Sequence, residues 1–387
     1  MKISQEILDL KDEMIEMRRD FHRPPELGLH EIRTSGIAEQ RLKDLGYQVR
    51  RCSDTGVIGV LKGGKPGKTI LLRCDEDALP VTEETDLPFA SENPGVMHAC
   101  GHDGHLTIHL TTAKLLARHK DEIPGTVVML FQKNEEDAGA QLMIDDGALD
   151  DNPDAVCGFH LWSPIPTGMI GVVPGAIMAS SWYFYLTIHG KGGHGGAPHM
   201  AISPILVAAK VIEAAEYMVS SEINALTPTT IAFGQIHGGD KDIIIPDEVR
   251  LAGSIRCLHD GDDEVRNRFA ELCEKICEAY HCTCDISFKC GNSTLMNDPD
   301  MTKILIEAAS DVIGRENVRT EGVSTMIGDD FAEFSQQRPG VYYFIGTRSE
   351  KAGSIYEHHN SHFTIDEDSL PIAVQIQMNL VRKYLGF

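Results

Sequence analysis

Apolar runs of strand length alternate with amphipathic helical segments along the N-terminal part of the chain. Ile70-Leu71-Leu72 and the run from Val127 to Phe131 have the continuous apolar character of strands buried on both faces. Because parallel strands need helical crossovers, this alternation predicts an α/β fold with a mostly parallel sheet covered by helices on both sides. The expected helices cover residues 5–20, 31–45 and about 105–119, and the expected strands cover 56–62, 69–74, 126–132 and 154–159.

Side chains that bind metal ions or move protons follow three of these strands. In such sheets, functional groups gather at the carboxyl ends of strands. Asp75 and Asp77 share one face of an extended chain, because strand side chains alternate. Of the neighbours Glu135 and Glu136, one can bind a metal ion while the other acts as general base and then general acid. His160 follows the third strand, where a buried histidine without a function is the alternative.

The segment from Met97 to His105 contains three histidines, one cysteine and one aspartate. Cys100 and His102 are two residues apart, and Gly101 between them permits a turn that aims both side chains at one point. A thiolate and an imidazole together suit a borderline-soft divalent ion such as zinc. Two alternatives use the same residues. One is a structural loop of partly buried histidines, and the other is an enzyme with a Cys100 nucleophile, in which the two glutamates lack a role.

The pattern changes near residue 180. Alternation at 182–189 is followed by a helix near 204–219, strands at 229–237 and 248–258, a helix near 263–280 and a strand at 283–289. This β-α-β-β-α-β order is that of a ferredoxin-like α+β domain. We therefore predict a first domain at residues 1–181 that resumes at 293–387, with an inserted domain at 182–292.

Composition narrows the class of protein. The chain has 387 residues and a formal net charge of −23, which argues against nucleic acid and anionic membranes as partners, since both bind positively charged surfaces. No early segment resembles a signal peptide, and no apolar run approaches a membrane span. Ten cysteines with a metal-type Cys-x-His pattern indicate a reducing compartment, so we expect a cytoplasmic protein. Five cysteines cluster late in the chain, where we expect buried thiols rather than a second metal site: Cys273, Cys277, Cys282, Cys284 and Cys290.

Separated motifs carry a resemblance to a known family. They are Arg73 to Pro80, Met97 to His105, Phe131 to Glu136 and Gly190 to His194, together with Arg18 to His22, Pro25 to Leu27 and Pro246 to Glu248. In order and spacing they resemble the M20 metallopeptidases. The resemblance is closest to the amidohydrolase branch that contains hippurate hydrolases, N-acetyldiaminopimelate deacetylases and auxin-conjugate hydrolases. It runs essentially from end to end.

The resemblance implies two divalent metal ions in each subunit, zinc or manganese. The residues that match the family's metal ligands are Cys100, His102, Glu136, His160 and His359. His358 and His362 remain open as substitutes for the last of these. Glu135 matches the general base that takes a proton from the attacking water, and Asp77 matches the carboxylate that orients the site.

The resemblance also implies a role for the inserted domain. His194 matches a histidine that reaches across a dimer to stabilise the oxyanion. Family members are commonly homodimers joined through this domain, which also acts as a lid. The expected fold is therefore an α/β metal-binding catalytic domain with an inserted ferredoxin-like lid and dimerisation domain.

Three positions depart from the family pattern. Lys133-Asn134 stands where Pro-Ala usually precedes the two glutamates, and Lys133 faces either the cleft or solvent. Ile243 stands where the lid usually has asparagine, and Asp329 replaces a glutamate. None of these changes removes a ligand or the base. Because Ile243 offers only apolar contact, we expect a preference for bulkier or more apolar amides.

The resemblance implies that the substrate is an N-acyl amino acid or a similar conjugate, cleaved at its amide bond into a carboxylate and an amine. A dipeptidase or exopeptidase of the same superfamily and a catalytically silent binding protein are the alternatives. Asp75-Glu76-Asp77 in place of the usual His-x-Asp, with Cys100 as a ligand, favours the first assignment. The acyl group, the amino acid, the metal, and the choice between dimer and tetramer stay open.

Overall fold

The computed structural model describes residues 1–387, and the chain divides into two compact units. The first unit consists of Met1–Ile177, Leu295–Ser324 and Asp329–Phe387, and the second consists of Met178–Thr294 with Thr325–Gly328. The predicted insertion at residues 182–292 falls inside the second unit. The return of residues 325–328 to that unit had no signal in the sequence.

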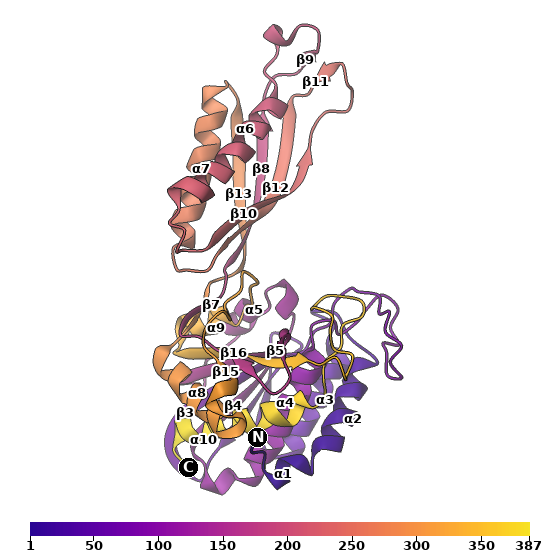
Figure 1. The fold of residues 1–387 in the computed structure, drawn as a ribbon, viewed down its shortest axis with the longest axis vertical. Coiled ribbons are helices and arrows are strands. Elements are labelled where there is room, and N and C mark those ends of the chain that lie inside the picture. Colours follow the sequence, from indigo (N-terminus) through magenta and orange to yellow (C-terminus); the bar gives the residue numbers. More distant parts are fainter. The chain divides into compact units, whose positions relative to one another are not determined.

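An eight-stranded sheet forms the centre of the first unit (Figure 1). Its central strands, in the order β4-β3-β5-β16, are parallel, whereas β1 and β2 join one edge in antiparallel pairs. The mostly parallel α/β fold predicted from the sequence is therefore confirmed. In sheet order the strands are β1 (Gln48–Cys52), β2 (Gly56–Lys62), β4 (Pro124–Gln132), β3 (Lys65–Asp75), β5 (Ala155–Pro166), β16 (Gly340–Arg348), β6 (Ile170–Gly171) and β15 (Val318–Arg319), and β7 (Gly175–Met178) forms a separate pair with β14 (Leu295–Asn297).

Helices cover both faces of this sheet. On one face α4 and α10 pack against β3, and Ile70 and Leu72 belong to the buried core there. On the other face Phe331, just before α9, packs against Tyr342 of β16 with ring centroids 5.3 Å apart. The neighbouring Tyr343 belongs to the first core, as strand alternation requires. The helices are α1 (Gln5–Leu8), α2 (Lys11–His22), α3 (Ile32–Asp44), α4 (His102–Arg118), α5 (Ala140–Asp145), α8 (Pro299–Ile313), α9 (Ala332–Gln337) and α10 (Ser369–Leu385).

The second unit is a four-stranded antiparallel sheet, ordered β10-β12-β8-β13, with α6 and α7 on one face (Figure 1). Alternation along β8 explains the two faces: Phe184 and Leu186 are buried under the helices, whereas Tyr183 and Tyr185 are exposed. This is the ferredoxin-like arrangement predicted from the sequence. Its elements are β8 (Ser181–His189), α6 (Pro204–Tyr217), β10 (Thr229–His237), β12 (Glu248–Cys257), α7 (Asp262–Ala279) and β13 (Thr283–Asn292), with a short ribbon of β9 (Gly193–His194) and β11 (Ile244–Ile245).

Three predictions of element bounds were wrong. The single helix expected at residues 5–20 is interrupted after Leu8, and a second helix begins at Lys11. The helix expected from about His105 begins at His102, because Gly101 in the left-handed conformation already turns the chain into the helix. The strand expected to end at Phe159 continues to Pro166, because β16 pairs with it along that length.

All ten cysteines are free thiols. Cys273, Cys277 and Cys282 are buried, as expected for the late cluster, whereas Cys284 is half-buried and Cys290 is exposed. None of the helices combines the length and the apolar character that crossing a bilayer requires.

Candidate metal centre

The turn that leads into α4 brings Cys100 and His102 together. Gly101 between them has φ 91°, a conformation in which a side chain would be strained. His102 Nδ1 donates a hydrogen bond to the backbone oxygen of Asp77 at 2.8 Å. This bond fixes the ring orientation and leaves Nε2 of the neutral ring as a free donor atom for a metal ion.

The sequence predicted His160 at the end of a strand. In the structure it lies within β5, so this prediction was wrong. β3 pairs with β5 only as far as Cys157, so the next part of β5 is open on that side. His160 Nδ1 donates a hydrogen bond to the Leu161 oxygen at 2.7 Å, and its Nε2 lies 3.4 Å from the Cys100 sulfur. Cys100, His102 and His160 thus form one group whose donor atoms lie within 4.8 Å of one another.

A second group contains Glu136. This residue lies in a short 3₁₀ turn, Glu135–Asp137, directly after β4, and its N–H donates to Asp77 Oδ2 at 3.1 Å. Its Oε1 lies 3.3 Å from Nε2 of His359. Cys100, Glu136 and His359 have donor atoms within 4.8 Å of one another, so the two groups share the Cys100 thiol.

The other late histidines are engaged elsewhere. His358 Nε2 donates to the Leu161 oxygen at 2.9 Å, and His362 Nδ1 lies 3.1 Å from the hydroxyl of Ser361. Neither belongs to a donor group. His359 has φ 65°, an uncommon conformation for a residue with a side chain, and such backbone strain clusters at functional sites.

Several buried polar atoms in this centre have no hydrogen-bond partner, as expected of ligands that a cation would bind. They include His102 Nε2, Asp77 Oδ1 and Glu136 Oε1, although buried polar atoms are normally paired. The 3.3–3.4 Å separations between donor atoms match the ~3.4 Å edge of a tetrahedron of ligands about 2.1 Å from zinc. Burial opposes a charge on His102, yet the carboxylates of Asp75 and Asp77 raise its pKa to about 10, so these surroundings favour a positive charge, which a bound metal ion can supply in place of the proton on Nε2. The donor set therefore fits divalent metal ions.

The environment of Cys100 does not suit a free nucleophile. Burial, Glu136 and Glu135 raise the pKa of its thiol well above the usual range. Reactive cysteines need the opposite setting, an electropositive one that lowers the pKa. The thiol becomes a thiolate readily only if a cation compensates the neighbouring carboxylates, which favours a ligand role.

Glu135 lies between the donor groups and a buried network of charges. Its carboxylate oxygens approach those of Asp329 and Asp330 within 4.8 Å. Burial, Asp329 and Glu136 raise the pKa of Glu135 well above the usual range. The guanidinium of Arg73 lies 3.0 Å from Asp330 and 3.3 Å from Asp329 and holds these two carboxylates in place. A carboxyl group in such surroundings keeps its proton unless a nearby cation compensates the other carboxylates, so Glu135 can act as a base only with cations at the donor groups.

Part of this network was not predicted from the sequence. Arg73 binds Asp75 at 2.7 Å, and Asp75 Oδ1 accepts a hydrogen bond from His105 Nδ1 at 2.5 Å. Two sequence patterns could have indicated these contacts. Arg73 and Asp75 share one face of a strand, and His102 and His105 are spaced by one turn of α4.

One departure from the family pattern is now resolved. Lys133 is only 3% exposed, which excludes the alternative that its side chain faces solvent.

Comparison with known proteins agrees with the resemblance seen in the sequence. Residues 71–383 match the model of peptidase family M20/M25/M40. This chain belongs to that family. This M20 chain is similar to the solved structure of the Bacillus subtilis YXEP protein, which is described as a dinuclear metal binding peptidase from M20 family. The TM-score is 0.84 and the sequence identity is 30%, over 97% of this chain and 99% of that one.

Three relatives of this M20 protein match over most of their length. Thermostable carboxypeptidase 1 of Saccharolobus solfataricus is 39% identical over 99% of this chain and 98% of the relative. N-acetyl-L-cysteine deacetylase of Bacillus subtilis is 37% identical over 93% of this chain and 85% of the relative. Hippurate hydrolase of Campylobacter jejuni is 35% identical over 100% of both chains.

In the second unit of this M20 protein, His194 lies on the short β9–β11 ribbon, where it pairs with Ile244 (Figure 1). Its Nδ1 accepts a hydrogen bond from the Gly196 N–H at 2.9 Å. The neutral ring therefore carries its proton on Nε2, which is free to donate. Ile243, next to this pair, is 63% exposed.

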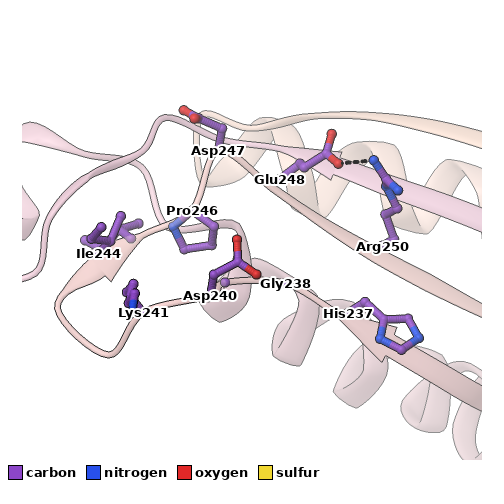
Figure 2. A pocket seen from close by; sticks show the side chains of 11 residues that line it. His237, Gly238, Asp240, Lys241, Ile244, Pro246, Asp247, Glu248 and Arg250 are labelled. Carbon is purple, nitrogen blue, oxygen red and sulfur yellow. Dashed lines mark hydrogen bonds and ion pairs between the residues drawn. The ribbon is translucent and has the colours of Figure 1, made fainter.

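A hollow of about 870 Å³ opens beside the ribbon. Figure 2 shows Lys241 and Asp240 on its loop and the ion pair between Glu248 and Arg250, whose atoms are 2.5 Å apart. A smaller hollow of about 430 Å³ shares this loop and reaches Gly195, the residue after His194. The ribbon that carries His194 is therefore bordered by a concave surface with apolar residues and charges of both signs.

Proposed function

We propose that this chain is a two-metal amidohydrolase that cleaves the amide bond of an N-acyl amino acid, or of a similar conjugate, into a carboxylate and an amine. The observation that carries the proposal is the pair of donor groups that share Cys100, with Glu135 beside them. The ligands that we assign are Cys100, His102, Glu136, His160 and His359.

Zinc or manganese are the ions that we expect, because a mixed set of thiolate, imidazole and carboxylate donors suits such divalent metals. Bound there, the two ions supply a Lewis acid for the amide carbonyl and lower the pKa of water. Glu135 takes a proton from the attacking water and returns it to the leaving amine, a role supported by its place beside His102 and Glu136, with donor atoms within 4.8 Å of one another. Asp77 orients the site through its bonds to His102 and Glu136.

We assign the stabilisation of the oxyanion to His194. The bond from Gly196 leaves its Nε2–H free to donate, which is what a developing negative charge requires. His194 belongs to the second unit, so closure of a lid or a second subunit must bring it to the substrate. We propose that the second unit is a lid and dimerisation domain and that the enzyme is a homodimer.

The names of the relatives support this substrate class. Hippurate hydrolase and N-acetyl-L-cysteine deacetylase are named for N-acyl amino acids. Carboxypeptidase activity is the second candidate, favoured by the 39% identity to thermostable carboxypeptidase 1. The two activities are chemically close, because the last residue of a peptide is itself an amino acid acylated on nitrogen. A silent binding protein is disfavoured by the intact donor groups and base.

We further propose a small-molecule substrate and a cytoplasmic location, with neither nucleic acid nor a membrane as a partner. All ten cysteines are free, which suits a reducing compartment. The net charge of −23 opposes binding to anionic polymers and membrane surfaces.

Chelation and a substrate panel test the proposal together. We expect purified protein to lose turnover after treatment with a chelator and to recover it on addition of zinc or manganese. The panel contains N-acetyl, N-benzoyl and N-long-acyl amino acids, with dipeptides and longer peptides alongside. Full activity in rigorously metal-free protein would overturn the metal assignment. Cleavage of peptides alone would favour the carboxypeptidase.

A further inference from the structure

Two histidines outside the assigned ligand set hold the peptide group that orients His160. The Leu161 N–H donates to Nε2 of His105 at 2.9 Å. The Leu161 oxygen accepts hydrogen bonds from Nδ1 of His160 at 2.7 Å and from Nε2 of His358 at 2.9 Å. The backbone N–H of Leu161 and both lone pairs of its carbonyl oxygen are therefore all hydrogen-bonded to imidazole rings.

The position of Leu161 in β5 explains why it needs these partners. Val156 N–H donates to Pro339 oxygen, on the β16 side of the strand. Peptide groups alternate sides along a strand, so those of Leu161 face the opposite side, toward β3. β3 pairs with β5 only as far as Cys157 and gives Leu161 no partner. Unpaired buried backbone groups are costly, so the three imidazoles replace the missing strand.

His105 and His358 are themselves held by their surroundings. The Nδ1 of His105 is bonded to Asp75, which Arg73 also binds. The ring of His358 packs against Trp162, with centroids 4.7 Å apart, and against His160 at 5.1 Å. Each histidine thus has one nitrogen directed at Leu161 and a packed or bonded ring behind it.

We propose that His358 and His105 are positioning residues for His160, which act by fixing the Leu161 peptide, and that His358 is not a metal ligand. The inference rests on the proposed metal-binding function. With the Leu161 oxygen fixed, the bond from His160 Nδ1 holds the ring so that its Nε2 faces Cys100 at 3.4 Å. Loss of such supporting bonds behind a metal-binding histidine typically lowers metal affinity about 10–100-fold.

Two amide substitutions at His358 give a matched test. Glutamine places an N–H donor near the Nε2 position of histidine, whereas the side chain of asparagine is one methylene too short to reach Leu161. We expect His358→Asn to weaken zinc binding at the His160 group roughly tenfold or more. We expect His358→Gln to stay within about threefold of the wild-type affinity, so that the conservative variant rescues the loss. His362→Asn, in the same loop but without a bond to Leu161, is the control with unchanged affinity.

Zinc titration by calorimetry, with elemental analysis at saturation, separates the outcomes. The proposal expects two ions per chain at saturation in both His358 variants. Loss of one ion in both variants would make His358 a ligand and overturn the proposal. Equal affinity in His358→Asn and wild type would also overturn it. If the wild-type protein bound no ions, the proposed function itself would fail, which is a different and recognisable result.

Cobalt substitution provides a second readout that a general loss of stability does not mimic. The absorption bands of bound Co²⁺ report the geometry of its ligands, so we expect His358→Asn to shift them and His358→Gln to restore them. His105→Asn retains a donor toward Asp75 but cannot accept from Leu161, so it should shift the bands in the same way if folding is retained. Wild-type spectra in both asparagine variants would contradict a positioning role.

Discussion

At the scale of single residues, we propose separate roles for the two adjacent glutamates, and substitution can distinguish them. Glu135→Gln keeps the side-chain shape but cannot carry a proton, so we expect turnover to fall by two or more orders of magnitude, roughly the contribution of general acid–base catalysis. Metal content should stay nearly unchanged, whereas Glu136→Gln should lose an ion. Turnover and elemental analysis of both variants check this. If Glu135→Gln emptied the site while Glu136→Gln kept its metal, the two roles would have to be exchanged.

Glu76 is a residue whose burial has a cost for stability. Its side chain is fully buried, and neither carboxyl oxygen has a hydrogen-bond partner. Burial and the carboxylates of Glu31 and Asp77 raise its pKa well above the usual range. Below the unfolded-state pKa of about 4.3, Glu76 is protonated in both states and does not change the free energy of unfolding. As the pH rises from there toward the folded-state pKa, only the unfolded state loses its proton, so the free energy of unfolding falls.

We therefore expect Glu76→Met to stabilise the protein, and increasingly so with pH. The gain should grow by up to about 1.4 kcal/mol per pH unit between pH 5 and the folded-state pKa. Thermal unfolding from pH 5 to 8 measures it, with Glu92→Met at an exposed position as the control. Parallel pH curves for wild type and Glu76→Met would show that Glu76 is not the group responsible.

At the scale of elements, a buried ion pair docks α2 on the start of α4. Arg18 Nε lies 2.9 Å and His22 Nδ1 2.8 Å from Asp103 Oδ2, and all three side chains are buried. Burial opposes the charged carboxylate, but Arg18 and His22 lower the pKa of Asp103 far below its usual value. The stability that this carboxylate contributes is therefore present above the unfolded-state value of about 3.9 and is lost only in strong acid.

Asp103→Asn should destabilise the protein by up to about 3–5 kcal/mol at neutral pH, because it removes the fully buried carboxylate of the pair and leaves Glu367, 3.1 Å from Nη1 of Arg18, as the remaining counter-charge of that guanidinium. Asp20→Asn is a control on the same helix, since Asp20 and Arg33 form an exposed pair that contributes less than about 1 kcal/mol. Chemical denaturation of both variants at neutral pH measures the difference. Equal destabilisation by the two substitutions would contradict the importance of burial.

Local patterns in the sequence predicted the elements and part of the site, and contacts between distant segments supplied the rest. The Cys100-Gly101-His102 turn depends on one glycine and was therefore visible in the sequence. His160 was assigned to a strand end because an apolar run stops there, yet pairing with β16 extends the strand by several residues. The bond of Arg73 to Asp330 joins residues 257 positions apart, and no local periodicity encodes such a contact.

At the scale of the whole molecule, the role proposed for His194, which belongs to the second unit, predicts that activity depends on how units combine. Loss of one hydrogen-bond donor to the oxyanion lowers kcat about 10²–10³-fold. We therefore expect the His194→Ala variant to be nearly inactive while its metal ions remain bound. If sites are completed between subunits, mixing His194→Ala with Glu135→Gln should restore partial activity. Mixed dimers are verified with two affinity tags before turnover is measured. No recovery in verified mixed dimers would favour closure of the lid within one chain.

The surface beside His194 should set the substrate preference of the assembled enzyme. Ile243 is 63% exposed, and its backbone oxygen accepts a hydrogen bond from Gly195, the residue after His194, so Ile243 and His194 lie on the same end of the ribbon. An isoleucine there contacts apolar groups, whereas an asparagine would donate a hydrogen bond to a substrate carboxylate, which is worth roughly 1.5–3 kcal/mol when the partner is charged.

We therefore expect the wild-type enzyme to prefer N-acyl amino acids with bulky or apolar acyl groups over N-acetyl amino acids. A bond from asparagine to the carboxylate would benefit all N-acyl amino acids alike, whereas loss of the apolar contact weakens only the bulky acyl groups. Ile243→Asn should therefore raise kcat/KM for N-acetyl substrates relative to N-benzoyl and long-acyl substrates by about tenfold or more, the equivalent of at least ~1.4 kcal/mol. Ile243→Val, which keeps an apolar contact, is the matched control and should leave the ratio unchanged. The preference would not depend on Ile243 if the wild type already cleaved N-acetyl amino acids efficiently and Ile243→Asn changed nothing. The substrate would then be selected by other residues of the site.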